Sequence, residues 1–281
     1  MFTRIATIIA VGFLLAVVSP IAMAQPPILV LDANEDDDAK DGWTNTGSAG
    51  GVVPTGDGRP DYDRDGGPGG TAAYTSTECG HNFSTADDEL DGRPELMVAS
   101  WTLEITAKQN GPAVDVNEGG GEHHLIGMVD QGWPFGQWIG YRFELGDPPD
   151  FSASDLRITL AAAKSGGIDN NQHLFPVATL PFGEWAVLTT TFNNDDGVMK
   201  TYVNGEEQSE FETIQDFDDT IPFDVIGIFL IPGDNPCRGF GGSISRVRMW
   251  DRVVDAGEFG TSVEVNGKLA TTWSRVKAGS Y

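Results

Sequence analysis

The chain has 281 residues, with 42 acidic residues against 17 Lys and Arg, and a formal net charge of −25 at neutral pH. Nucleic acid is disfavoured as a partner, because the phosphate backbone attracts clustered basic side chains and none are clustered here. Strong acidity instead suits an extracellular protein, or one that collects divalent cations.

The first residues have the layout of a secretory signal. Arg4 is followed by an apolar run from Ile5 to Val18, and a small-x-small motif ends at Ala24. We expect cleavage of residues 1–24; an uncleaved anchor is the alternative, because the run is near the lower limit, about 17 residues, for crossing a bilayer. The mature chain would then have 257 residues, a charge of −26 and no further membrane span. It would be secreted, periplasmic or held at the cell surface.

The region from residue 32 to residue 95 is acidic and rich in turn-forming residues. It carries 16 acids and four bases, with repeated Gly, Pro and Asp-Gly pairs. This composition predicts long loops with few short strands. Two apolar islands, Ile28–Leu31 and Ala72–Tyr74, are candidates for strands that join the main sheet.

One motif in this region resembles the opening of a calcium loop. Asp61, Asp63 and Asp65 alternate and are followed by Gly66, which supplies the oxygen ligands that calcium prefers. The twelfth position is Ala72, however, where such a loop has a closing Glu. A solvated acidic turn is the alternative interpretation.

From residue 97 onward, apolar and polar residues alternate. In the first run, Trp101 and Leu103 alternate with Thr102 and Glu104, which predicts a half-buried strand. The later strand-like runs are His124–Val129, Trp138–Leu145, Leu156–Ala163, Trp185–Phe192, Val198–Val203, Val225–Ile231 and Ser243–Trp250. Turn-forming residues separate the runs, and Asn204-Gly205 suits a tight hairpin. The class is therefore antiparallel β, as a two-sheet sandwich or jelly roll.

Two segments carry a family resemblance. The run from Trp185 to Gly205, with Trp opening one strand and Tyr-Val-Asn-Gly ending the next, resembles the central hairpin of laminin-G-like jelly rolls. About forty residues later, Gly241–Arg252 resembles the closing strand of that family, and Glu258-Phe259 resembles the residues that follow it. The resemblance implies an all-β, antiparallel two-sheet jelly-roll sandwich of the laminin-G or concanavalin A-like type.

The same resemblance sets the expected domain limits. The jelly-roll domain is expected at residues 25–260, with its clearest part at residues 97–259. A polar C-terminal tail, residues 261–281, would lie outside the core.

The superfamily contains both binding modules and enzymes. Its β-glucan hydrolases carry Glu-x-Asp-x-x-Glu on one strand, because retaining hydrolysis needs two carboxyl groups about 5–5.5 Å apart. That motif is absent here, and the acids Glu104 and Glu144 are isolated on strand-like runs. We expect a non-catalytic module that binds a glycan or an extracellular protein. The alternatives are a glycan-active hydrolase or lyase with an unrecognised acid pair, and a structural surface module.

The resemblance also implies a calcium site at one rim of the sandwich. In calcium-binding laminin-G-type modules, an acid after an early strand meets an acid or amide just before the closing strand. The matching positions are Asp130, with Asp234 or Asn235. Trp133 and Phe135 lie in the adjoining Gly/Pro-rich loop, where they could stack on a sugar ring or a protein, or pack back onto the sheet.

The only two cysteines are Cys79 and Cys237. Export into an oxidising compartment makes a single disulfide between them the simplest expectation. Two free, buried thiols are the alternative.

Overall fold

The computed structural model describes residues 25–36, 41–85, 92–110, 122–130, 137–145, 153–161, 173–212, 216–230, 239–256 and 258. Within these ranges the only helical element is the 3₁₀ turn Pro68–Gly70, and the remaining regular structure is strand. Accordingly, the described ranges contain no helix that is long and apolar enough to cross a membrane.

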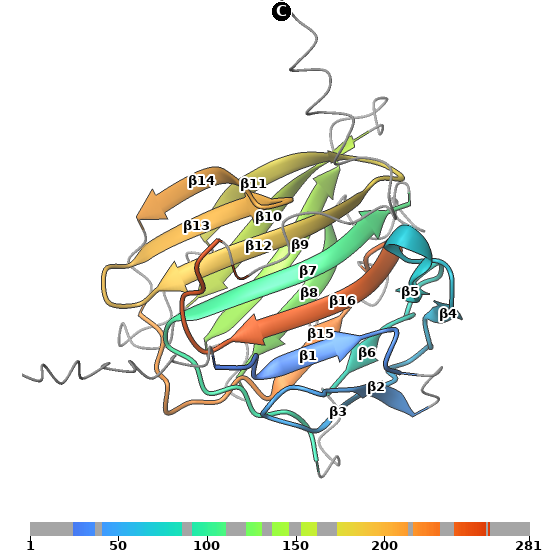
Figure 1. The fold of residues 1–281 in the computed structure, drawn as a ribbon, viewed down its shortest axis with the longest axis horizontal. Helices are drawn as coiled ribbons and strands as arrows, with labels where there is room; N and C mark the ends of the chain where they lie inside the picture. The colour runs from blue at the N-terminus through green and yellow to red at the C-terminus, as the bar shows by residue number, and fades with distance from the viewer. Residues whose placement is uncertain are drawn as a thin grey trace, which may run out of the picture.

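The larger sheet has eight strands. They are β1 (Leu29–Asp32), β4 (Asp61–Asp63), β5 (Ala73–Thr75), β7 (Trp101–Gln109), β12 (Trp185–Asn193), β13 (Val198–Val203), β14 (Glu206–Glu212) and β16 (Gly242–Trp250). Their order is β14-β13-β12-β7-β16-β5-β4, and β1 also pairs with β16. Strands that come late in the chain therefore lie beside strands that come early (Figure 1).

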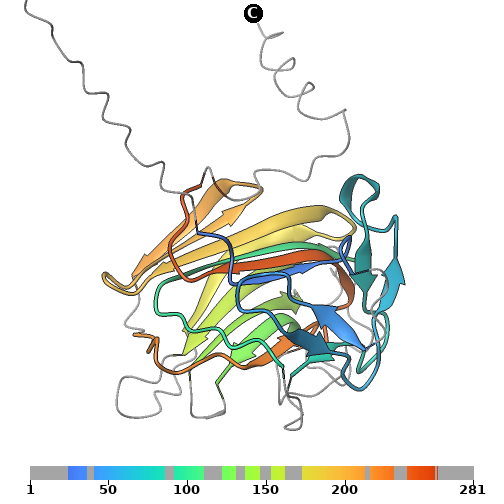
Figure 2. The same cartoon turned by 60° about the horizontal axis from the view of Figure 1, so that its bottom comes forward.

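The smaller sheet has six strands. They are β6 (Phe83–Ser84), β8 (Glu122–Val129), β9 (Trp138–Leu145), β10 (Ala153–Ala161), β11 (His173–Pro181) and β15 (Val225–Ile228), in the order β11-β10-β9-β8-β15-β6. A separate pair, β2 (Gly42–Thr44) and β3 (Val52–Pro54), completes the described strands. The two large sheets face each other as layers, and the short N-terminal strands gather at one side (Figure 2).

The strand runs predicted from residue 97 onward all form strands, and the described pairings between named strands are antiparallel. The predicted islands at 28–31 and 72–74 become β1 and β5, which both pair with β16. The sequence did not predict β11 or β14. The seven residues of β14 include four Glu and only one apolar residue, Phe211, so no alternation marks them as a strand. β14 forms a strand because it pairs with β13, a contact that its own residues do not indicate.

The core lies between the two large sheets. Trp101, Leu103 and Ile105 of β7 point inward from the larger sheet, and Ile126 and Met128 of β8 belong to the same fully buried cluster. Burying side chains of this size stabilises a fold by about 1.5–3 kcal/mol each. One polar contact crosses the core, a hydrogen bond between the hydroxyls of Tyr141 on β9 and Thr190 on β12. Burial raises the pKa of Tyr141, so this hydroxyl stays protonated.

The predicted hairpin at Asn204-Gly205 is confirmed. Both residues have positive φ, 52° and 79°, as a tight two-residue turn requires. The Asn204 amide Oδ1 accepts a hydrogen bond from the backbone N–H of Val187 at 3.0 Å, which ties the turn to β12.

The prediction that β7 is half-buried is wrong, because its outward-facing side chains are buried as well. Thr102, Glu104 and Thr106 are each at most 4% exposed. They are covered in part by residues 251–256, here called the crossover segment, which leaves the end of β16 and turns back across the neighbouring strands (Figure 1). Alternation in a sequence describes which face a side chain takes, and it does not show whether a later segment covers that face.

A threonine holds the crossover segment in place. The Thr102 hydroxyl donates to the backbone carbonyl of Arg252 and accepts from the backbone N–H of Val254, both at 2.9 Å. Val254 packs against Tyr202 and Trp250 in a small cluster of buried residues outside the main core. The aromatic residues Tyr202 and Trp250 therefore pack on the outer face of the sheet and not between the sheets.

Beside this cluster lies a buried charge. Glu104 accepts two hydrogen bonds from Arg248, from Nε at 2.9 Å and from the terminal nitrogen at 2.6 Å, and Arg246 approaches the same oxygen at 3.5 Å. The Arg248 guanidinium also lies 4.9 Å from the ring centre of Trp250. Such pairing offsets the cost of burying a carboxylate that is only 1% exposed.

Candidate functional site: the Asp130 rim

A buried acid forms the base of the loop between β8 and β9. Asp130 follows β8 directly and is 4% exposed. Its Oδ2 accepts the backbone N–H of Gln137 at 2.8 Å, and its own N–H donates to the Gln137 carbonyl at 3.1 Å. The two ends of the loop are thereby fixed to each other at the point where β8 ends and β9 begins. We call this end of the sandwich the Asp130 rim.

The side chain of Gln137 extends this base to a second loop. Its Nε2 donates to the backbone carbonyls of Asp218 and Ile221 at 3.1 and 2.8 Å, and its Oε1 accepts the N–H of Asp218 at 3.0 Å. Gln137 is fully buried and cannot reach water, so these hydrogen bonds satisfy the polar atoms of its side chain. The Asp218 carboxylate in turn accepts from the N–H and hydroxyl of Thr220.

A third segment joins through the turn between β12 and β13. The Asn194 amide donates to the Asp216 carboxylate at 3.1 Å and accepts the N–H of Phe217 at 2.8 Å. The backbone N–H of Asn194 donates to the Ser100 hydroxyl at 2.9 Å. Four separate chain segments are thus bonded together at this end, mainly through the side chains of Gln137 and Asn194.

The Asp130 rim is acidic. Residues 97–100 and 216–224, together with Asp130, contain five Asp and no Lys or Arg. The Arg93 guanidinium pairs with one of them, Asp224, at 2.9 Å. The remaining charge attracts cations and disfavours anionic ligands.

Trp133 and Phe135, the expected ligand platform, lie outside the described residues. The ends of their loop are placed, since Asp130 and Gln137 stand directly before and after residues 131–136.

Sequence reasoning identified Asp130 but missed Gln137, Asn194 and Asp218. Gln137 carried one usable signal, its position just before the strand run that opens at Trp138. Asn194 and Asp218 carried none.

Asp234 and Asn235 also lie outside the described residues, but the segments on either side of them are placed. After β15, the Phe229 N–H bonds the Leu125 carbonyl, and Gly239 pairs with His124. These contacts are near the start of β8, whereas Asp130 follows its end, about 20 Å away at about 3.4 Å per residue.

Residues 231–238 connect Leu230 to Gly239, and they lie outside the described ranges. The joint calcium site of these residues therefore stays a prediction.

The competing motif at Asp61, Asp63 and Asp65 forms the edge strand β4 and the turn after it. Asp63 uses one carboxylate oxygen to accept the backbone N–H of Asp65 at 3.0 Å, which shapes the turn. Within the described ranges, no three His, Cys, Asp or Glu residues are grouped closely enough to hold a metal ion. Calcium at this motif stays a prediction.

Cys79 lies in the exposed turn between β5 and β6, at the opposite end of the sandwich from Asp130. Three residues earlier, the backbone N–H of Ser76 donates to the carbonyl oxygen of Gly242, at the start of β16, at 2.9 Å. Cys237 precedes β16 by only a few residues but lies outside the described ranges. No free cysteine occurs within those ranges, and the pairing of Cys79 with Cys237 stays a prediction.

Two facing antiparallel sheets, closed by loops that meet at a polar rim, define the chain as an all-β sandwich of the jelly-roll class. The chain belongs to the concanavalin A-like lectin/glucanases superfamily, whose family model matches residues 82–259, more than half of the sequence. The resemblance found in the sequence is therefore confirmed. No curated protein matches the chain at a significant level.

Solved structures share the fold at low sequence identity. A receptor-binding domain of botulinum neurotoxin type G is 11% identical with a TM-score of 0.50, over 83% of this chain and 49% of the toxin domain. Domain 4 of AbnA, a GH43 extracellular arabinanase from Geobacillus stearothermophilus solved with arabinotriose, is 16% identical with a TM-score of 0.52, over 85% of this chain and 98% of that domain. The chain spans about half the length of the toxin domains that it matches.

Proposed function

We propose that the mature chain is an exported binding module, without hydrolytic activity, that recognises a glycan or an extracellular protein through the Asp130 rim. The observation that carries this proposal is the buried pair of Asp130 and Gln137, which clamps both ends of the loop bearing Trp133 and Phe135. Gln137 anchors that base to residues 218–221 as well. A loop fixed at its base loses less entropy when it binds, so its aromatic residues can contribute more of their contact energy.

Glu104, one of the two acids on strand-like runs, does not favour hydrolysis. A catalytic carboxyl group has to reach the sugar, either as nucleophile or as proton donor. Glu104, an acid in the middle of a core strand, is 1% exposed and is bound by Arg248. Its carboxylate stabilises the fold and is closed to a substrate.

The proposal is tested by binding to arrays of glycans and of extracellular proteins. Replacing both Trp133 and Phe135 by Ala should weaken binding to the selected ligand at least tenfold, because aromatic anchors dominate interface energies. Trp185→Ala, at the opposite rim, is the matched control and should bind as the wild type does. Equal binding by the double variant and the wild type would refute the rim, and release of reducing ends from any bound glycan would refute the absence of hydrolysis.

We also propose that calcium binds at this rim. The described residues fit this only in part: Asp130 contributes one carboxylate, whereas calcium takes six to eight oxygen ligands. Loop carbonyls from residues 131–136 and the side chains of Asp234 or Asn235 are the candidates for the others. The acidity of the rim supports the proposal, because a bound cation would offset repulsion among the carboxylates.

Thermal melting with and without calcium tests this site. At a hundredfold excess over the dissociation constant, calcium should stabilise the fold by about 2.7 kcal/mol. Asp130→Asn should abolish the shift, and Asp63→Asn should leave it intact. Asp234→Asn then decides whether residues 231–238 reach the rim. No shift in the wild type would refute calcium binding, and loss of the shift only in Asp63→Asn would assign it to the N-terminal motif.

Export and the Cys79–Cys237 disulfide are proposed together, because an oxidising compartment is what makes the bond stable. The placement of Cys79 and of the start of β16 at one end of the sandwich supports the pairing. Closing so long a loop should stabilise by about 4–5 kcal/mol in the chain-entropy model. Titration of the unfolded, unreduced mature protein should find no free thiol, and two thiols per chain would contradict the bond.

A further inference from the structure

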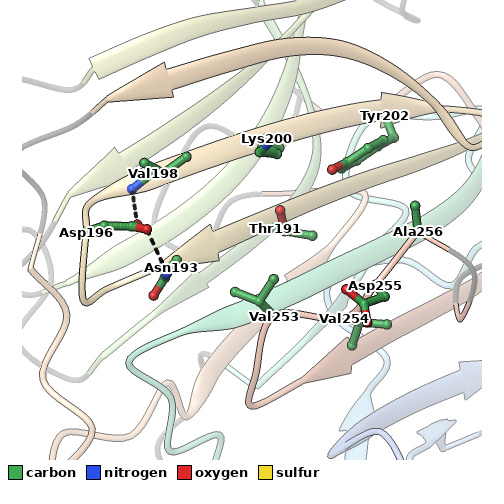
Figure 3. Close-up of a pocket in the computed structure, with 10 residues that line it drawn as sticks. All are labelled: Thr191, Asn193, Asp196, Val198, Lys200, Tyr202, Val253, Val254, Asp255 and Ala256. Atoms are coloured by element: carbon green, nitrogen blue, oxygen red, sulfur yellow. Dashed lines mark hydrogen bonds between the residues drawn. The ribbon is translucent and has the colours of Figure 1, made fainter.

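A hollow of about 270 Å³ lies on the outer face of the larger sheet, away from the loop between β8 and β9. Alternate residues of β12 and β13 form its floor, and the crossover segment forms one wall (Figure 3). The lining residues are Thr191, Asn193, Asp196, Val198, Lys200, Tyr202, Val253, Val254, Asp255 and Ala256. This volume equals about nine water molecules at about 30 Å³ each. It is smaller than the pockets of about 300–1,000 Å³ that hold drug-sized ligands.

The polar groups of the hollow are held in place before any ligand arrives. Asp196 accepts the backbone N–H of Val198 and the side-chain amide of Asn193, both at 2.9 Å (Figure 3). On the floor, the Lys200 ammonium lies 2.5 Å from Glu210 and 3.6 Å from Glu207. Groups fixed in this way lose little entropy on binding.

The hollow also has apolar surface. Val198 on the floor and Val253 and Val254 on the wall line it together with the ring of Tyr202. Burial, and then the nearby Glu207, raise the pKa of Tyr202, so its hydroxyl stays protonated at neutral pH. A ligand that fits must therefore offer apolar C–H surface as well as several hydroxyl-type hydrogen-bonding groups.

The local charge restricts the ligand further. Glu207 and Glu210 more than offset the charge of Lys200, and Asp196 and Asp255 add two carboxylates to the lining. Anionic ligands are repelled by this potential. Carboxylate oxygens also accept hydrogen bonds from hydroxyl groups, so a neutral polyhydroxylated ring matches this lining without the repulsion that an anion meets.

We propose that this hollow binds one neutral sugar ring, independently of the Asp130 rim and of calcium. Hydroxyls of the ring would donate to Asp196 and Asp255 and accept from Lys200 and Thr191. The C–H face of the ring would lie against the valines and Tyr202. The crossover segment is the part of the fold that creates the site, because without residues 253–256 the outer face of β12 and β13 would have no wall.

Ligand-observed NMR in the presence of a calcium chelator tests the site. The probes are the methyl glycosides of glucose, galactose, mannose and arabinose, with galacturonate as the anion and glucosamine as the cation. We expect at least one neutral glycoside to bind, and galacturonate to bind more weakly. Preferential binding of galacturonate or glucosamine, or no binding of any neutral glycoside, would overturn the proposal.

Two pocket variants and two controls locate the binding. Ala256→Phe should fill the hollow and Thr191→Val should remove a hydroxyl while keeping the side-chain shape, and each should weaken binding at least tenfold. Lys108→Met, on the same sheet face beside Trp185, should leave it unchanged. Asp130→Asn should also leave it unchanged, which separates failure here from failure at the rim.

Melting curves confirm that each variant is folded. Binding that survives both pocket variants would overturn the proposal, as would binding that depends on Asp130.

Discussion

The two faces of the larger sheet are both buried, but by different kinds of contact. On the inner face, Leu103 and Ile105 of β7 belong to the apolar cluster between the sheets. On the outer face of the same strand, Thr102 and Glu104 are covered with the help of the crossover segment and are held by hydrogen bonds and ion pairs. The inner face is secured by burial of apolar area, which many substitutions of similar volume preserve. The outer face depends on a few specific polar partners, whose individual loss leaves buried groups unsatisfied.

The largest expected effect belongs to the inner face. Leu103→Ala removes a fully buried side chain from the centre of the core. It should lower the free energy of unfolding by about 2–5 kcal/mol through lost burial and a remaining cavity. Urea denaturation measures this loss, with Val52→Ala at an exposed position as the control. A loss below about 1 kcal/mol would mean that the inner face is less tightly packed than described.

The next effect is expected at the buried charge on the outer face. Glu104→Gln keeps the shape of the side chain but leaves Arg248 and Arg246 without their carboxylate. The free energy of unfolding should fall by about 1–3 kcal/mol, since both guanidiniums are partly exposed and water replaces part of the interaction. Replacing Glu104 and Arg248 together by Leu and Met should recover part of the loss. The two losses measured for Glu104→Leu and Arg248→Met alone are added for comparison. If the double variant loses more stability than this sum, the cluster stabilises the fold through packing as well as through its charges.

A smaller effect is expected at the contact that holds the crossover segment. Thr102→Val keeps the side-chain volume and removes both hydrogen bonds to residues 252 and 254. Stability should fall by about 1–2 kcal/mol. Hydrogen exchange at the Val254 amide should accelerate more than exchange within β7. Equal acceleration at both places would show that the segment does not open separately from the sheet.

The smallest effect concerns the end of the crossover segment and depends on pH. Arg252 lies 2.8 Å from Glu258, and the hydrogen bond to Arg252 lowers the pKa of Glu258 below its ordinary value of 4.5. A lowered folded-state pKa adds stability that is present above pH 4.5 and disappears as the pH falls through the folded value.

Both side chains are in contact with solvent, Arg252 at 28% and Glu258 at 36% exposure, so the change should be slight. Glu258→Gln should remove it from a series of melting curves taken on either side of that pH, with Glu212→Gln as the control. A pH dependence that persists unchanged in Glu258→Gln would assign it to other carboxyl groups.

The candidate sites differ in how much of them could be predicted. Asp130 was found through the family resemblance, which implies an acid directly after an early strand. Its partner Gln137 and the contacts of Asp218 and Asn194 join segments that are up to 94 residues apart in the sequence. The expected meeting of Asp130 with Asp234 depended on strand lengths and pairing order, and the structure places their flanking segments at opposite ends of β8. The hollow beside the crossover segment had no sequence signal at all.

By itself, the sequence determined the all-β class, most of the strands and the hairpin at Asn204-Gly205. Each of these follows from residues that are neighbours in the chain, through alternation of side chains or through tolerance of positive φ. Tertiary structure decided that β14 is a strand, that the outer face of β7 is buried and that Tyr202 and Trp250 pack outside the main core. These outcomes depend on which distant segment lies against each surface, and pairing and coverage of that kind leave no periodic trace in the residues themselves.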